Sequence, residues 1–151
     1  MLKNRRSYRK LYPEEAYKFA GGADKQTYIQ MHASLRPALH AGNKTCTRRT
    51  WGGVKQGMQM RAFHNNELVA VTGQGHSSTI GYLRYTSMST SSVGVLLTDS
   101  DLRAEGGTAS SDMDFRRRWY RVKDKITGLY VMLPNATVVH VLTFTFYSTT
   151  S

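Results

Sequence analysis

The stretch from residue 34 to residue 49 constrains the fold most, because it specifies a short helix, a turn and a strand in immediate succession. Ser34 is a suitable helix N-cap, and Pro37 falls in the first turn, where its missing N–H costs nothing. Gly42 suits the left-handed residue that ends many helices. The threonines and the cysteine that follow are poor helix formers and favour extended backbone. We therefore expect a helix over residues 34–41 and then a strand.

Alternation along that strand gathers chemical groups on one face. Residues two apart share a face of an extended chain, so Thr45, Thr47 and Arg49 should point the same way. Lys44 starts on the other face, but its long side chain at the helix–strand corner can curl back toward Thr47. A lysine amine beside a threonine hydroxyl is a candidate base and nucleophile. Cys46 should point away from Thr47, which predicts a buried structural thiol.

A catalytic role for Lys44 sets a condition on its surroundings. To act as a base the amine must be neutral, yet the unperturbed pKa of lysine is about 10.4. Activity near pH 7 requires the pKa to fall by about three units, or roughly 4 kcal/mol, through burial or nearby cations such as Arg48 and Arg49. The alternative is an ordinary surface lysine. The chemistry therefore requires that Lys44 lies inside a cleft.

The spacing Gly42-x-Lys44-x-x-Thr47-x-Arg49 resembles the GxKxxTxR signature of the ASCH domain superfamily. The resemblance runs over roughly residues 27–146 and includes a strand and helix before the motif, a turn at residues 55–57, and Glu105 followed by glycine. It implies a mixed α+β, mainly β, fold: a small PUA-like barrel of five or six strands with two or three flanking helices. The implied domain covers residues 27–151, after a basic N-terminal extension over residues 1–26.

The resemblance also implies an activity. Small bacterial members with Lys, Thr and Glu at these positions are amidohydrolases that remove the acetyl group from N4-acetylcytidine. Carried over, Thr47 is the nucleophile, Lys44 the base and Glu105 a proton relay or the group that orients the lysine. Arg49 and Arg48 are expected to bind substrate, although Arg49 is equally explained as a structural ion-pair partner. Neither a metal nor a cofactor is implied.

Glu105 is the preferred carboxylate for the site, but a position close to Lys44 would conflict with the use of that lysine as a base. It is preferred over the other carboxylates only because it matches the family's Glu-Gly position. A carboxylate close to Lys44 raises the pKa of the amine, which opposes its use as a base. Glu105 must therefore be distant, protonated, or offset by the arginines. Trp51, Trp119 and Tyr120 are either core residues or platforms that stack on a base.

The net charge of +11 and a pI near 10 favour a polyanionic or phosphorylated partner. Basic residues crowd the first ten positions, where they form either a solvated tail or a nonspecific RNA contact. Other ASCH proteins of similar length resemble RNA-binding proteins, and some have ribonuclease activity. The alternative is therefore a PUA-like RNA-binding module that uses the extension and residues 116–118, or a nuclease that reuses Lys44.

Composition also bears on location. A chain of 151 residues is long enough for one domain with a real core. The single cysteine excludes an internal disulfide and fits a reducing compartment. No apolar run approaches the roughly 18 residues of a membrane span, and no apolar stretch follows the basic N-terminus. We expect a cytoplasmic protein with a nucleoside substrate and no membrane partner; oligomeric state and acyl preference are left open.

Periodicity predicts the remaining elements. A helix is expected over residues 13–19, a second ending near Glu105, and a third from residue 113 to about 123. The expected strands cover residues 28–32, 57–63, 67–72, 79–88, 128–133 and 137–146. The serine- and threonine-rich residues 87–92 are expected to form a loop.

Overall fold

The computed structural model describes residues 26–73 and 76–149, so the helix expected over residues 13–19 lies outside the described residues. The described chain is mixed α+β and mainly β. Its elements in order are β1 Tyr28–Gln30, the 3-10 helix η1 Ala33–Leu35, α3 Arg36–His40, β2 Cys46–Arg49, α4 Gly53–His64, β3 Val69–Gly73, β4 His76–Ser92, α5 Asp99–Ala104, α6 Asp112–Trp119, β5 Arg121–Lys123, β6 Tyr130–Met132 and β7 Val138–Ser148. None of these helices is both long and apolar enough to cross a membrane.

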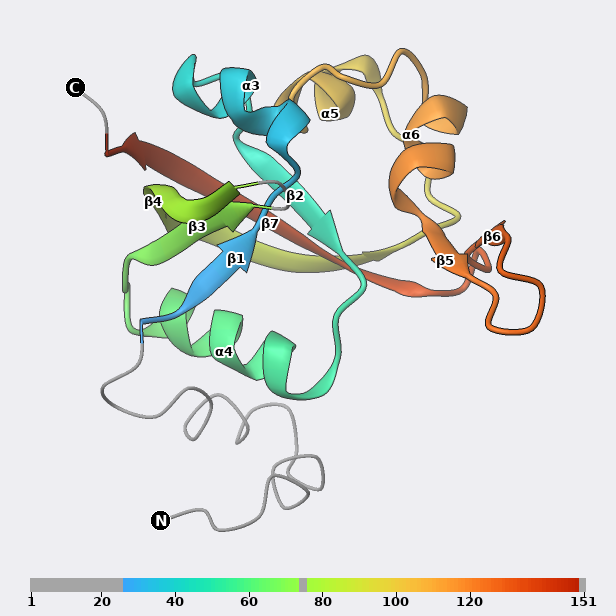
Figure 1. The fold of residues 1–151 in the computed structure, drawn as a ribbon, viewed down its shortest axis with the longest axis horizontal. Coiled ribbons are helices and arrows are strands. Elements are labelled where there is room, and N and C mark those ends of the chain that lie inside the picture. The colour runs from blue at the N-terminus through green and yellow to red at the C-terminus, as the bar shows by residue number, and fades with distance from the viewer. Residues whose placement is uncertain (1–25, 74–75, 150–151) are drawn as a thin grey trace, which may run out of the picture.

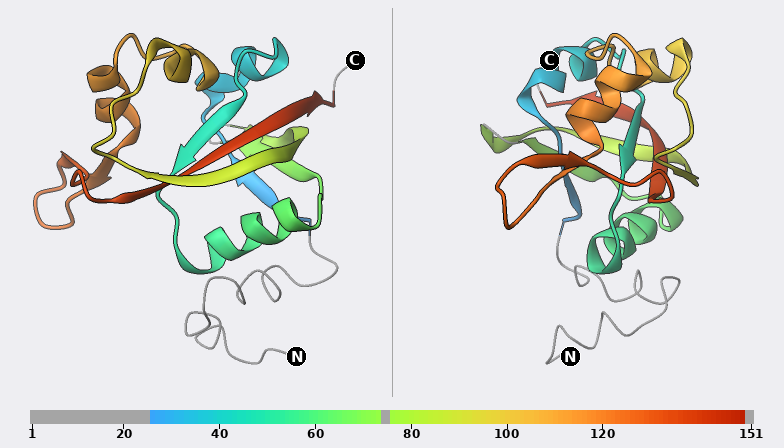
Figure 2. Two further views of the ribbon diagram at one scale, coloured as in Figure 1. Left: turned by 180° about the vertical axis from the view of Figure 1, so that it is seen from behind. Right: turned by 90° about the vertical axis from the view of Figure 1, so that its right-hand side faces the viewer.

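Five strands form one sheet in the order β1-β3-β4-β7-β2. β1 runs parallel to β3, and the other neighbours are antiparallel. Helix α4 lies on one side of this sheet, and α3, α5 and α6 gather on the other (Figures 1 and 2). β5 and β6 form a separate two-stranded hairpin that projects from the body of the molecule (Figure 1).

The two edge strands of the sheet, β1 and β2, are linked by a side chain. Arg49 at the end of β2 donates from Nη2 to the backbone carbonyl of Gln30 in β1, at 2.7 Å. In the described part of the chain no backbone ladder joins these strands, so pairing leaves the sheet open there. The predicted fold class is confirmed, whereas closure into a barrel stays a prediction.

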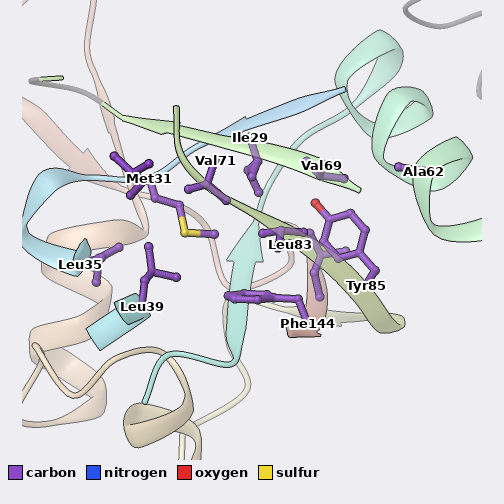
Figure 3. Close-up of a cluster of buried hydrophobic side chains, with 12 residues drawn as sticks. Ile29, Met31, Leu35, Leu39, Ala62, Val69, Val71, Leu83, Tyr85 and Phe144 are labelled. Atoms are coloured by element: carbon purple, nitrogen blue, oxygen red, sulfur yellow. The ribbon is translucent and has the colours of Figure 1, made fainter. Parts of the chain in front are cut away.

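A main hydrophobic core is built on the strands β1, β3, β4 and β7 and on the helices that cover them (Figure 3). Val69, Val71 and Leu83 are completely buried. Full burial of such side chains contributes about 1.5–3 kcal/mol each. A second cluster packs α5 and α6 against β7; its members are Val93, Leu102, Ala109, Phe115, Tyr120 and Val139. This second cluster fixes the end of α5, which carries Glu105, beside β2.

The helix–turn–strand prediction around Gly42 is confirmed. Gly42 has φ of +77°, which favours glycine, and strand β2 follows. The predicted N-cap is wrong. The helical segment begins as a 3-10 turn capped by His32, whose Nδ1 accepts a hydrogen bond from the backbone N–H of Ser34 at 3.1 Å. An imidazole nitrogen thus replaces the expected serine hydroxyl.

The strand expected over residues 57–63 is wrong, because this segment lies within helix α4. The turn expected at residues 55–57 lies in the same helix. Methionine, glutamine, arginine and alanine are good helix formers, and a seven-residue alternation does not by itself distinguish the two structures. Tertiary contacts favour the helix: Gln59 and Arg61 are buried, and the Gln59 amide donates to the Tyr28 carbonyl at 2.9 Å.

The loop expected over residues 87–92 is also wrong, because β4 continues to Ser92. These residues pair with residues 138–143 of β7. Within the described chain, only the first half of β4 pairs with β3, so the second half of β4 lies at an edge of the sheet. Polar serine and threonine side chains are compatible with such an edge because one side faces water.

The third expected helix is shorter than predicted. α6 ends at Trp119, and the next residues form β5, where Val122 is 50% exposed rather than facing the core with Phe115. The strand expected over residues 128–133 is present as β6, but it pairs with β5 and stays outside the main sheet. With α4, the described residues contain four α-helices, whereas two or three flanking helices were expected.

Candidate active site

A cavity of about 260 Å³ opens where β1, η1, β2, α5 and α6 meet. Every predicted site residue lines it. Its lining comprises Gln30, Met31, His32, Leu35, Lys44, Thr47, Arg48, Arg49, Thr50, Trp51, Glu105, Phe115, Trp119 and Tyr120. Ligand pockets typically measure about 300–1,000 Å³, so this cavity is suited to a nucleobase-sized group rather than to a large cofactor. Among the described residues, no group of three or more His, Cys, Asp or Glu side chains could hold a metal ion.

Backbone hydrogen bonds fix the position of Lys44. The amides of Asn43 and Lys44 both donate to the carbonyl of Ala38, at 2.8 and 3.1 Å. The amide of Thr45 donates to the carbonyl of Ala104 in α5, at 2.8 Å. The loop between α3 and β2 is therefore held between two helices, and it carries Lys44 inward, where 2% of the residue is exposed.

The Lys44 amine is fully engaged. Nζ donates to the carbonyl of Cys46 at 2.7 Å, to the carbonyl of Glu105 at 2.9 Å and to Oε2 of Glu105 at 3.1 Å. Burial lowers the pKa of Lys44, because desolvation of the ammonium outweighs the opposing attraction of the Glu105 carboxylate. The neighbouring Arg49 guanidinium pushes the pKa in the same direction as burial.

Glu105 joins two cations. It is the C-cap residue of α5, and it receives Lys44 on Oε2 and Arg48 Nη1 on Oε1, the latter at 2.9 Å. Arg48 also contacts Asp101 at 3.3 Å, so this arginine holds carboxylates in place rather than pointing a free guanidinium into the cavity. Gly106 has φ of +119°, and a Cβ there would lie 3.3 Å from Leu35. The Glu-Gly pair thus combines a buried carboxylate with a backbone turn that favours glycine.

Thr47 and Arg49 share a face, as predicted. Nε of Arg49 donates to the Thr47 hydroxyl at 2.9 Å, and its guanidinium lies 5.3 Å from the Trp51 ring centroid. The expected contact between Lys44 and Thr47 is not made in the described structure, because the three donors of Lys44 are used elsewhere. The two side chains nevertheless line the same cavity.

The aromatic residues combine the two roles considered for them. Trp51 and Trp119 pack partly against the core and also line the cavity. Tyr120 is 2% exposed and packs edge-on against Phe115, so it is mainly a core residue. Sequence reasoning missed Gln30 as a site residue. Its contribution is a main-chain carbonyl that accepts from Arg49, and no side-chain pattern signals such a role.

Cys46 is buried, as predicted, and unsuited to nucleophilic attack. Burial, followed by the negative charge of Glu105, raises the pKa of its thiol from 9.0 to about 11. The thiol lies on the face of β2 opposite to Thr47 and contacts Nη1 of Arg48 at 3.6 Å. The thiolate is the reactive form of cysteine, so this residue is a structural one.

We expect Cys46 to react slowly with a thiol reagent in the folded protein. A pKa two units above normal leaves about 100-fold less thiolate at pH 8, and burial slows access further. The measurement is the rate of reaction with a chromogenic disulfide before and after unfolding in guanidinium chloride. Because the chain has one cysteine, the signal is unambiguous. Equal rates in the two states would contradict the assignment of a buried, protonated thiol.

No protein-family model matches the chain, and no curated protein matches it. Among solved structures, the chain is similar to the crystal structure of protein EF3133 from Enterococcus faecalis V583, which is described by the family model DUF984. The two superpose with a TM-score of 0.50 at 14% identity, over 86% of this chain and 74% of that chain. At this identity the likeness shows a shared fold and carries no assignment of activity.

Proposed function

We propose that the protein is an amidohydrolase that cleaves the N4-acyl amide of N4-acetylcytidine and related N4-acylated cytosine nucleosides. The observation that carries the proposal is the presence of a desolvated amine and a hydroxyl in the lining of one cavity. Lys44 is 2% exposed and lies 3.1 Å from Glu105, and Thr47 lines the same cavity.

The same proposal includes membership of the ASCH superfamily and closure of the sheet into a PUA-like barrel. The sequence motif supports the first, and the hydrogen bond from Arg49 to Gln30, which links the two edge strands, supports the second.

Deprotonation gives Lys44 the means to reach Thr47. An ammonium has three N–H donors, and all three are used at rest. A neutral amine has two donors and one lone pair, so one contact is vacated and the lone pair becomes an acceptor for the Thr47 O–H. The carboxylate of Glu105 is within hydrogen-bond distance of Nζ and relays the proton that the ammonium releases to solvent.

The reaction then proceeds in two steps. Thr47 Oγ1 attacks the acyl carbon while its proton passes to Lys44, and collapse of the tetrahedral intermediate breaks the C–N bond. The exocyclic nitrogen leaves as cytidine after receiving the proton from Lys44, and an acyl ester remains on Thr47. Water attacks this ester and gives a proton to Lys44. Lys44 returns that proton to Thr47 Oγ1 as the ester C–O bond breaks, which releases the carboxylic acid and restores Thr47. The Arg49 Nε donor stabilises negative charge as it develops on Oγ1.

The test is to mix the protein with N4-acetylcytidine and follow the ultraviolet spectrum. We expect conversion to the spectrum of cytidine, with acetate as the second product. A Cys46→Ala variant serves as a matched control, because its side chain lies on the opposite face of β2, and it should retain activity. An unchanged spectrum with folded protein would overturn the proposal.

The rival is a PUA-like RNA-binding module, and one surface favours it. The hairpin of β5 and β6 projects from the body of the molecule (Figure 2), and the residues of both strands are exposed. On it, the Arg121 guanidinium lies 4.2 Å from the Tyr130 ring centroid. The expected basic run on α6 is less available: Arg116 and Arg118 pair with Asp112 and Asp114 at 2.7 and 3.0 Å. RNA binding that weakens steeply with salt, without conversion of N4-acetylcytidine, would favour this rival.

A further inference from the structure

A second cavity, of about 110 Å³, adjoins the first at the meeting point of β1, the end of β2 and α4. Gln30, Arg49 and Trp51 line both cavities, so the two share one wall. The rest of the second lining is Tyr28, Ile29, Lys55, Met58 and Gln59. A ligand that occupies both cavities must therefore pass this wall, which contains Arg49 and Trp51.

The charges around the two cavities are unbalanced. Together the linings contain four cationic side chains, Lys44, Arg48, Arg49 and Lys55, and one carboxylate, Glu105. That carboxylate is already occupied by Lys44 and Arg48. Within the described residues, neither Arg49 nor Lys55 forms an ion pair, and these are the two cations of the second cavity. A neutral nucleoside leaves their charge uncompensated, whereas an anion compensates it.

The size of the second cavity limits what it holds. Its volume of about 110 Å³ is less than half that of the first cavity, which suits a small group such as a phosphate. Guanidinium and ammonium groups are the usual protein partners of phosphate. Arg49 also donates to the Thr47 hydroxyl, so a phosphate bound beside it would help to fix the group that reacts.

We propose that the second cavity binds the phosphate of a cytidine nucleotide, through Lys55 and Arg49, while the acylated base occupies the first cavity. This inference rests on the proposed function and specifies its substrate class: N4-acylated cytidine carrying a phosphate. The phosphate belongs either to a free mononucleotide or to an RNA strand, and the chemistry that recognises it is the same in both cases.

The first test is binding of the deacylated products, which does not depend on turnover. Calorimetry should show cytidine 5′- or 3′-monophosphate binding roughly 10- to 100-fold more tightly than cytidine. Lys55→Gln should reduce monophosphate affinity to about that of cytidine and leave cytidine binding within about twofold. Lys125→Gln, which removes the same charge from the exposed hairpin, should keep the preference. Equal affinities in the wild type, or a preference that survives Lys55→Gln, would overturn the inference.

A kinetic comparison separates this inference from the proposed function. With N4-acetylcytidine and its monophosphates as substrates, we expect the higher kcat/KM for a monophosphate and loss of that advantage in Lys55→Gln. Hydrolysis with equal kcat/KM for all of them overturns the inference and leaves the amidohydrolase standing. Binding that depends on Lys55, without hydrolysis, overturns the amidohydrolase and leaves the phosphate site standing.

Tighter binding of a cytidine dinucleotide than of either monophosphate assigns the phosphate to an RNA strand.

Discussion

Replacing Thr47 by alanine should reduce kcat/KM for N4-acetylcytidine by at least about 10³-fold, the scale on which loss of a covalent nucleophile acts. The Thr47 hydroxyl is the group that Arg49 holds toward the cavity, at 2.9 Å. In Thr47→Ala no acyl ester can form, whereas Thr47→Ser keeps the oxygen and should retain measurable activity. Initial rates from the absorbance change compare the two variants directly.

Stability measurements must accompany that comparison. Thr47 is 4% exposed and accepts a hydrogen bond from a charged donor, so its loss should cost about 1.5–3 kcal/mol, which a domain of ordinary stability tolerates. Circular dichroism and thermal unfolding show whether Thr47→Ala is folded at the assay temperature. A folded Thr47→Ala variant that retained a tenth of wild-type activity would contradict the covalent mechanism and would favour direct attack by water.

Glu105→Gln should be the most destabilising conservative change in the site, lowering the free energy of unfolding by about 3–5 kcal/mol. The substitution keeps the shape of the side chain but removes the negative charge between Lys44 and Arg48, whose contacts measure 3.1 and 2.9 Å. Arg48 retains Asp101, whereas Lys44 is left with carbonyl acceptors alone in a buried position. Urea denaturation followed by fluorescence measures the change.

Asp99→Asn provides the matched control for this prediction. It makes the same carboxylate-to-amide change on the same helix α5, but at an exposed position in the first turn. Its expected cost is about 0.3–1 kcal/mol, through loss of a favourable helix-dipole interaction. Similar losses of stability in Asp99→Asn and Glu105→Gln would mean that the buried charge cluster contributes little to the stability of the contact between α5 and β2.

Local sequence patterns were sufficient to predict which residues meet at the centre of the site. A glycine with positive φ after a short helix, followed by a strand of alternating faces, placed Thr47 and Arg49 together. The burial of Cys46 followed from the same alternation. These predictions depend only on backbone preferences over a few residues, so they transfer from sequence to structure without knowledge of tertiary packing.

Long-range geometry was beyond such rules. Glu105 lies 61 positions from Lys44, and its approach depends on the cluster that packs α5 against β7. Only the resemblance to a family indicated that Glu105 belongs to the site. Helix α4 was missed because alternation over seven residues fits a strand as well as a helix, and burial of Gln59 and Arg61 decides between them. The contacts of Lys44 were not predictable either. Its amine donates to two carbonyls and a carboxylate rather than to Thr47, and tertiary structure brings the carbonyl and carboxylate of Glu105 within its reach.

The most direct test of the account is the rate of cytidine release from N4-acetylcytidine as a function of pH. Protonated Lys44 cannot accept the Thr47 proton, so the active fraction grows as pH rises. We expect log kcat/KM to increase with a slope of about one per pH unit. Because burial lowers the pKa of Lys44, log kcat/KM should level off at a pH below the ordinary lysine pKa of 10.5. A rate that is independent of pH or falls as pH rises, or the absence of cytidine at every pH, would contradict the account.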